Sequence, residues 1–223
     1  MELLNGTKNS TIVLIMVSIN PNPRSRRGDR REQLLDGLEG IFLKEGFRNV
    51  TVEELASRLR CSRQTLYRVA PSKPEIFLTV LDRFLSRIRA EGREAAYSRG
   101  DPNQRIEALL EPGITATVPA SRRFTEDVDG YEPARLLLAE HQRERMRLLG
   151  EIVEDGISRG VFSGFHAHLV AEVMVAAVGR VSRPDFLAEA RLSMSEAFDE
   201  CSRLIRLGLA RTSGEKNLES SLE

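Results

Sequence analysis

Two capped helices joined by a short turn dominate the sequence between Thr51 and Lys73. Thr51 and Glu54 have the capping-box spacing, in which a hydroxyl and a carboxylate satisfy free N–H groups at a helix start. Ser62 is a second N-cap residue, and the helix that it begins carries the apolar Leu66. Two helices separated by three or four residues form a helix-turn-helix, whose second helix can enter a DNA major groove. The stretch therefore predicts a DNA-binding unit, with Leu66 facing its core.

The charge of this stretch favours the same function. Between Arg58 and Lys73 there are four arginines and one lysine, and no acidic residue. Such side chains neutralise phosphates and release counterions, although a run of charges is more usually a solvated helix face. Here Gln64, Thr65 and Tyr67 are interleaved with the basic residues, and these groups hydrogen-bond to bases and phosphates. DNA binding is therefore the stronger interpretation.

An ordered set of residues in this region resembles the TetR family of bacterial transcriptional regulators, over roughly residues 30–80. The residues that carry the resemblance are Thr51, Leu55, Ala56, Leu59, Cys61, Ser62, Thr65, Leu66, Tyr67, Ser72, Lys73, Glu75 and Ile76. The family usually has Gly where this chain has Arg60, and Tyr or His followed by Phe where it has Val69 and Ala70. An Arg at positive φ costs about 1 kcal/mol relative to Gly, so we expect a turn of altered shape. Val69 also removes one side chain that could contact a phosphate.

The candidate DNA contacts fall into two groups. Arg63 and Gln64 lie at the start of the second helix, where Arg suits guanine O6/N7 and Gln suits adenine N6/N7. The resemblance implies that Thr51, Tyr67 and Lys73 contact phosphates, and Lys73 also lies at a helix N-terminus that favours an anion. The full set of candidates is Thr51, Ser62, Arg63, Gln64, Thr65, Tyr67, Arg68 and Lys73.

The two halves of the chain carry opposite charge, although the formal net charge is zero. Residues 1–100 hold 18 Lys/Arg against 12 Asp/Glu, and residues 101–223 hold 15 against 21. A basic head on an acidic body that does not bind DNA fits this division. Helical periodicity without any strand pattern predicts an all-α fold. We expect an arm at 1–27, a three-helix helix-turn-helix domain at 28–75, a helical ligand-binding and dimerisation domain at 76–211, and a disordered tail at 212–223.

The first thirty residues predict an arm. The apolar run Ile12–Ile19 is too short to span a bilayer, and it lacks the pattern of a signal peptide. We therefore expect a cytoplasmic protein. The run Arg24–Arg31 has five arginines and one acidic residue. It could reach a minor groove or phosphates, and a solubilising linker is an equal alternative.

Capping residues and apolar stripes predict the remaining helices. Ser72 with Glu75 is a second capping box, and Asp101 followed by Pro102 is a good helix start. The expected helices span residues 30–45, 72–97, 101–112, 132–159, 166–181 and 185–210. Pro112-Gly113 is expected to end the third of these.

The resemblance implies that the last two helices form a four-helix dimer interface, and Val178 and Phe198 are candidates to face the partner. A homodimer matches a palindromic operator of double-stranded DNA. An unidentified small-molecule effector is expected in a mostly apolar pocket between the helices that start near Ser72 and Glu132. The candidate lining residues are Phe84, Ile88, Phe124, Tyr131, His141 and Arg145.

Other chemistry has little support in the sequence. Glycine-rich phosphate loops, nucleophile elbows and Cys-x-x-Cys pairs do not occur. His168 and Glu172 have the spacing of two metal ligands on one helix face, but two ligands do not make a site. His141 is more simply a hydrogen-bonded core or pocket residue. We therefore expect no enzyme, no cofactor and no metal.

Two functional hypotheses follow. The first is a dimeric regulator, expected to be a repressor, whose operator binding is released by a small molecule in the body. The second is a helix-turn-helix module that makes protein contacts or binds DNA without sequence preference, with no inducer. Protection of a short palindrome would distinguish them.

Overall fold

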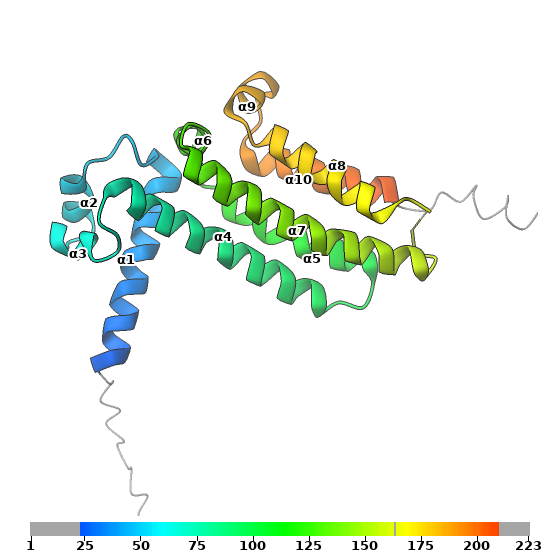
Figure 1. Cartoon of the computed structure of the whole chain (residues 1–223), viewed down its shortest axis with the longest axis horizontal. Helices are drawn as coiled ribbons and strands as arrows, with labels where there is room; N and C mark the ends of the chain where they lie inside the picture. Colours follow the sequence, from blue (N-terminus) through cyan, green and yellow to red (C-terminus); the bar gives the residue numbers. More distant parts are fainter. Residues whose placement is uncertain (1–22, 163, 210–223) are drawn as a thin grey trace, which may run out of the picture.

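The structure, a computed structural model, describes residues 23–162 and 164–209. Over these ranges it is built from helices without a β-strand, which confirms the all-α prediction. The helices are α1 Pro23–Glu45, α2 Val52–Arg58, α3 Arg63–Tyr67, α4 Lys73–Tyr97, α5 Pro102–Thr117, α6 Arg122–Asp129, α7 Glu132–Ser158, α8 Ala167–Val181, α9 Pro184–Ala190 and α10 Met194–Leu209. Figure 1 shows α1, α2 and α3 as a head at one end of a body made of the long helices, with α4 running from one into the other.

The first helix is longer than the sequence predicted. It begins at Pro23 instead of near Arg30, so the run Arg24–Arg31 is helical. Proline is tolerated in a first helical turn because its missing N–H would have no partner there, and Arg is a good helix former. The rest of the expected arm and the expected tail at 212–223 lie outside the described residues.

Helix α4 connects the two parts of the molecule. Its start is capped by the Ser72 hydroxyl, which accepts a hydrogen bond from the Glu75 N–H at 3.3 Å. The Glu75 carboxylate accepts from the same hydroxyl at 3.0 Å instead of from the Ser72 N–H, so the predicted capping box is only half formed. Further along, α4 packs against α5 and α7. Gly92 permits the contact with α5, because a Cβ there would lie 2.7 Å from the Leu109 carbonyl oxygen.

Helix α5 does not end at Pro112-Gly113, as expected, but continues to Thr117. A proline inside a helix removes one N–H and crowds the preceding turn. Arg145 of α7 donates hydrogen bonds to two carbonyls of that turn, those of Leu109 at 3.0 Å and Leu110 at 3.4 Å. A Cβ at Gly113 would lie 2.8 Å from the Arg145 guanidinium, so the glycine makes room for this contact.

The last predicted helix is divided in two. α9 ends at Ala190, and Arg191 follows in the left-handed conformation with φ of 56°. Ser193 and Glu196 then exchange hydrogen bonds as a capping box: Ser193 N–H donates to the carboxylate at 2.7 Å, and Glu196 N–H donates to the hydroxyl at 3.2 Å. This Ser-x-x-Glu spacing was a readable signal in the sequence that the prediction of one helix over 185–210 missed.

The buried side chains form two main clusters. One joins the head to the near end of the body, and includes residues of α1, α2 and α3 together with Phe77, Phe84 and Phe124. The other lies between α5, α7, α8 and α10 and includes Leu149 and Ile152. Because the first cluster crosses the expected domain boundary at residue 75, the head does not pack separately from α4 and α6.

Candidate DNA-binding and effector sites

The helix-turn-helix forms by the local interactions that the sequence predicted. Glu54 accepts a hydrogen bond from the Thr51 N–H at 2.7 Å, and Thr51 Oγ1 accepts from the Glu54 N–H at 3.2 Å, which confirms the capping box. Ser62 Oγ accepts from the Thr65 N–H at 3.1 Å at the start of α3. Leu66 is fully buried, as expected, and it fixes the side of α3 that faces away from solvent.

The turn between α2 and α3 retains a left-handed residue although it lacks glycine. Arg60 has φ of 49°. Its N–H donates to the Ser57 carbonyl at 3.2 Å, and the Cys61 N–H donates to the Ala56 carbonyl at 2.9 Å. The turn therefore bears the strain of an L residue at positive φ instead of adopting another shape.

The exposed side of α3 presents most of the candidate DNA contacts to solvent. Ser62, Arg63, Gln64 and Arg68 are exposed, and the Tyr67 side chain is 46% accessible. Of the other candidates, Thr51 is exposed and Thr65 and Lys73 are half-buried. Arg63 is not free: its Nη1 lies 2.7 Å from Glu53 Oε1, and both side chains are well exposed. Such a surface pair contributes little to stability, so DNA can displace Glu53 at small cost.

Lys73 has a structural role that the sequence did not indicate. Its Nζ donates hydrogen bonds to the carbonyls of Val50 at 2.8 Å and Arg48 at 3.5 Å, and lies 5.8 Å from the Phe47 ring centroid. The side chain therefore ties the start of α4 to the loop between α1 and α2. A phosphate contact would have to share or replace these bonds.

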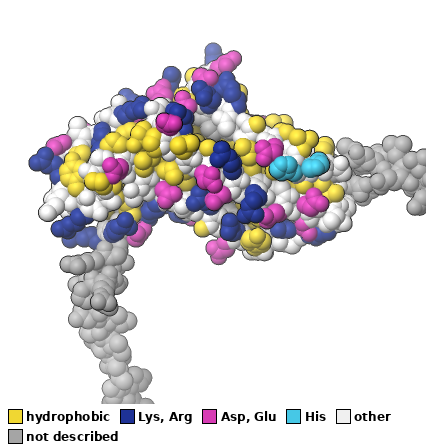
Figure 2. Space-filling model, viewed as in Figure 1, with side chains coloured by type: hydrophobic (Ala, Val, Ile, Leu, Met, Phe, Trp, Pro, Cys, Tyr) yellow, Lys and Arg dark blue, Asp and Glu magenta, His cyan; other side chains and the backbone are white. Residues whose placement is uncertain are grey.

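A broad groove of about 620 Å³ brings two separate basic stretches together. Arg30 and Arg31 of α1 line it. It is also lined by Thr65 of α3 and by the two residues that follow this helix, Arg68 and the half-buried Val69. Figure 2 shows dark blue Lys and Arg side chains around this tip of the head. Arg30 and Arg31 therefore contribute to the same surface as α3, from a helix. Val69 and the residue after it pack against the core instead of reaching outward.

The predicted effector residues gather around a cavity that is smaller than expected. Five of the six candidates line it, namely Phe84, Ile88, Phe124, His141 and Arg145. Its volume is about 30 Å³, which suits a single water molecule and not an apolar effector. The sixth candidate, Tyr131, does not line this cavity. Its ring packs against Phe47, with 5.8 Å between the centroids.

Three buried polar atoms at this cavity have no hydrogen-bond partner within the described structure. They are Nδ1 of His141, Oε1 of Gln142 and Nε of Arg145. Burial lowers the pKa of His141 to about 3, with further contributions from the charges of Arg145 and Arg89, so the ring is neutral. Burial likewise lowers the pKa of Arg145 to about 10, which leaves it cationic at neutral pH.

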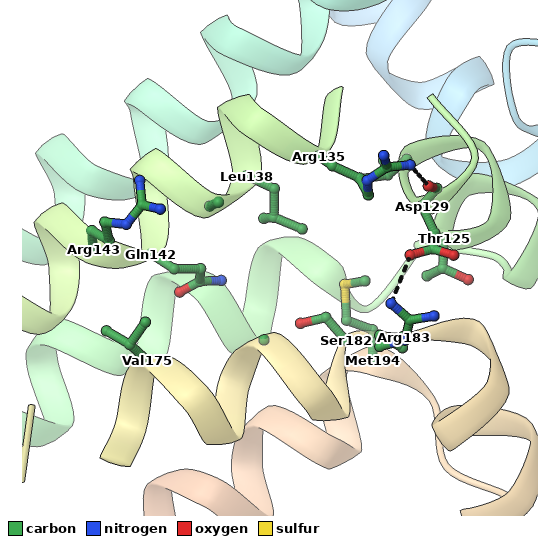
Figure 3. A pocket seen from close by; sticks show the side chains of 13 residues that line it. Thr125, Asp129, Arg135, Leu138, Gln142, Arg143, Val175, Ser182, Arg183 and Met194 are labelled. Carbon is green, nitrogen blue, oxygen red and sulfur yellow. Dashed lines mark hydrogen bonds and ion pairs between the residues drawn. The ribbon is translucent and has the colours of Figure 1, made fainter. Parts of the chain in front are cut away.

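A larger pocket of about 270 Å³ lies beside the small cavity and was not predicted from the sequence. It opens between α6, α7, α8 and the start of α10 (Figure 3). Its inner wall includes Val128, Leu138, Gln142 and Met194, which also line the small cavity. Its outer residues include Arg135, Arg143 and Arg183. The pocket escaped prediction because its lining residues are spread over four helices, whose packing no local pattern encodes.

Helix α6 connects this pocket to the head. Asp127 is buried, and its Oδ2 accepts hydrogen bonds from the N–H groups of Phe47 at 2.5 Å and Arg48 at 3.1 Å. Arg48 Nη2 donates to the Gly130 carbonyl at 2.7 Å at the other end of the same contact. Since Val128 of α6 lines the pocket, a ligand that moves α6 would also move the loop that follows α1.

Helices α8 and α10 expose an apolar face. The exposed residues are Phe165, Leu169, Val173, Leu204 and Leu207. Most of them line a groove of about 370 Å³ between the two helices, and Figure 2 shows hydrophobic side chains along the edge of the body where α8 lies. Val178 and Phe198 are not part of this face: Val178 is buried, and Phe198 packs inside the body. Their helices turn both side chains toward α5 and α7.

Within residues 23–162 and 164–209, no group of three or more potential ligands could hold a metal ion. His166 caps α8 through Nδ1, which accepts from the Leu169 N–H at 3.4 Å, and His168 and Glu172 are exposed on that helix.

None of the described helices is long and apolar enough to cross a membrane. Both cysteines are free thiols whose pKa is raised by burial.

The head is similar to known proteins. The sequence profile of the family described as bacterial regulatory proteins, tetR family, matches residues 34–80. The chain is 33% identical over 88 residues to the HTH-type transcriptional activator FasR of Mycolicibacterium smegmatis, covering 40% of each chain. It is 34% identical over 82 residues to the HTH-type transcriptional repressor KstR of the same organism, covering 37% of this chain and 40% of the relative. The match thus spans about 40% of the length of these relatives.

The fold of the body is also found among solved structures. The transcriptional regulator FadR of Bacillus subtilis, in complex with stearoyl-CoA, aligns with a TM-score of 0.60 over 80% of this chain and 99% of its own. The two sequences are 11% identical, so the likeness concerns the fold alone. The arrangement of a helix-turn-helix head on a helical body is therefore shared with this solved structure.

Proposed function

We propose that the chain, whose residues 34–80 match the tetR family of bacterial regulatory proteins, is a dimeric transcriptional repressor. A small molecule that binds in the body causes the protein to release its operator. The protein acts in the cytoplasm. The observation that carries the proposal is the exposed side of α3, where Arg63, Gln64 and Tyr67 project around the buried Leu66. This is the arrangement in which a recognition helix reads base edges and contacts phosphates.

The proposed DNA contacts divide by position. Arg63 and Gln64 read bases at the start of α3, because the N-terminal residues of a recognition helix enter the major groove. The other candidates contact the phosphate backbone of the DNA, namely Thr51, Ser62, Thr65, Tyr67, Arg68 and Lys73. Arg30 and Arg31, which share a groove with Arg68, add phosphate contacts that the sequence had placed on an arm.

The proposed dimer uses the apolar face of α8 and α10. Leu169 and Leu204 are 60% and 70% exposed. A contiguous exposed apolar patch of this kind is unusual on a monomeric protein and marks an interaction surface. A second copy packed through the same face would bury both and form a four-helix interface with two-fold symmetry. Such symmetry matches a palindromic operator, with recognition helices about 34–36 Å apart or a multiple of it.

The proposed release begins at the 270 Å³ pocket. A ligand that fills it contacts Val128 of α6 and Leu138 of α7. Asp127 holds the same α6 to the loop after α1, so a shift of α6 changes the position of the head relative to α4. The ligand must bind the DNA-incompetent arrangement more tightly, since equal affinity for both would shift nothing.

Selection of bound sequences from random DNA duplexes tests the proposal. We expect enrichment of one palindrome, and footprinting should show protection of that site alone. A variant with Gln64→Ala and Arg63→Ala should lose the enrichment while keeping its fold, because both side chains are exposed. Uniform binding to all sequences, or none, would instead favour a module for protein contacts or for DNA binding without sequence preference.

A further inference from the structure

One arginine of the body is buried without an acidic partner. Arg145 is 6% exposed, and no ion pair joins it to an Asp or Glu in the part of the chain that the structure describes. Its Nη2 donates to the carbonyls of Leu109 and Leu110, while Nε has no acceptor. A buried cation is destabilising unless it meets an anion or a complete set of acceptors, so this position favours an incoming negative charge.

The neighbouring groups on α7 form a polar corner around this cation. His141 precedes Arg145 by one helical turn, and Gln142 lies between them on the same side of the helix. His141 Nδ1 and Gln142 Oε1 are buried and unpartnered, like Arg145 Nε. All three residues line the 30 Å³ cavity, whose other walls are apolar side chains such as Phe84 and Phe124. The cavity is thus an apolar space with one cationic corner.

This corner is separated from the larger pocket by side chains that belong to both. Gln142, Leu138 and Met194 line the two spaces, and Figure 3 shows them between Val175 and the α6 side of the pocket. The outer pocket has apolar walls near Gln142 and holds about 270 Å³. Gln142 borders both spaces, so its displacement is what the two would need in order to join. A molecule with a small anionic end and an apolar body would then fit both.

We propose that the effector is an apolar carboxylic acid whose carboxylate binds Arg145 and whose body occupies the 270 Å³ pocket. The carboxylate accepts a hydrogen bond from Arg145 Nε and neutralises the buried guanidinium. Gln142 moves aside and presents its amide N–H groups, which donate to the same carboxylate. The inference rests on the proposed function, because it names the class of molecule that would release DNA.

Binding of carboxylic acids and their esters to the full chain tests this assignment. Decanoate and 1-adamantanecarboxylate, each with its methyl ester, are titrated calorimetrically without DNA. We expect at least one acid to bind about tenfold more tightly than its ester, which corresponds to one good charge-assisted contact. Arg145→Met should remove this preference and leave the ester's affinity unchanged. The matched control is Arg147→Met on the same helix, whose side chain is 66% exposed and pairs with Glu151.

Arg145→Lys keeps the charge and serves as a second test if the methionine variant fails to fold. It should retain a reduced preference for the acid. Equal affinity for acid and ester, a preference that survives in a folded Arg145→Met, or binding of neither acid would each overturn the inference. Those results would leave a trapped water as the partner of the three polar atoms.

A second set of measurements, made with operator DNA, separates this inference from the proposed function. Acid binding that depends on Arg145 but does not change affinity for the selected palindrome would support the site and contradict release by ligand. Absence of acid binding in a chain that still selects one palindrome would contradict only the effector class.

Discussion

The Asp127 carboxylate accepts a hydrogen bond from the Phe47 N–H at 2.5 Å, and this contact joins the pocket-lining helix α6 to the loop that follows α1. The same oxygen accepts from the next N–H at 3.1 Å. Gly46 makes the approach feasible: it has φ of 74°, and a Cβ there would lie 2.4 Å from Asp127 Oδ2. The residue is therefore placed to transmit displacement of α6 to the DNA-binding head.

We expect Asp127→Ala to lower the free energy of unfolding by about 1–3 kcal/mol, because it leaves the Phe47 N–H buried without an acceptor. Chemical denaturation measures this change. Glu126→Ala is the matched control, since Glu126 is exposed and pairs with Arg122 on the surface. If Asp127 carries the coupling, the folded variant should still bind its effector but release DNA less completely. Full release by the variant would contradict that role.

Arg63→Ala should cost about 1–3 kcal/mol of binding free energy on the selected palindrome and relax the preference at one base pair. Lys73→Ala should weaken binding to all sequences nearly alike and reduce the salt slope by about one. It should also destabilise the fold, because Lys73 bonds to the Val50 carbonyl. Binding of each variant to operator and scrambled duplexes over a salt series provides the measurement. An equal loss on both duplexes for Arg63→Ala would make it a phosphate contact.

Leu169→Glu should dissociate the proposed dimer at micromolar concentration. The charge would be buried in an apolar interface without a partner. Sedimentation velocity reports the change in mass. Leu136→Glu is the matched control, because Leu136 is similarly exposed, at 64%, but lies on α7 away from the α8–α10 face. A dimer that survives the first substitution, or a chain that is monomeric without it, would refute this interface.

Acid should destabilise the protein through His141. The ring has a pKa of about 3 when folded and about 6.5 when unfolded, so only the unfolded state binds the proton between these values. Its contribution is fully present above pH 6.5 and declines by up to about 1.4 kcal/mol per pH unit below it. Denaturation between pH 7 and 5 should show that His141→Gln has a smaller loss of stability than the wild type.

Arg60→Gly should stabilise the helix-turn-helix by roughly 0.5–1 kcal/mol, since glycine adopts φ of 49° without a Cβ clash. Arg60→Ala removes the same guanidinium but keeps the clash, so it should not stabilise. Thermal unfolding of the two variants isolates the backbone effect. Equal melting temperatures would show that the turn carries no strain at this residue.

The sequence by itself determined the local features of this protein. The capping residues Thr51 and Ser62 and the buried Leu66 specify the helix-turn-helix, because N-caps and apolar spacing act within one or two turns of chain. The same signals placed α4 and α7 within a residue or two of their ends. Where prediction failed locally, as at Ser193, a readable cap had been overlooked.

Tertiary structure alone decided what depends on contacts between distant segments. Helix α5 continues past Pro112, and a guanidinium from α7 packs against the turn before it and donates to two of its carbonyls. Val178 faces the body and Leu169 faces solvent, although both are apolar residues of α8, because neighbouring helices cover only one side of it. The pocket beside Gln142 likewise exists only where four helices meet. Such arrangements depend on which surfaces pack together, and no short stretch of sequence records that choice.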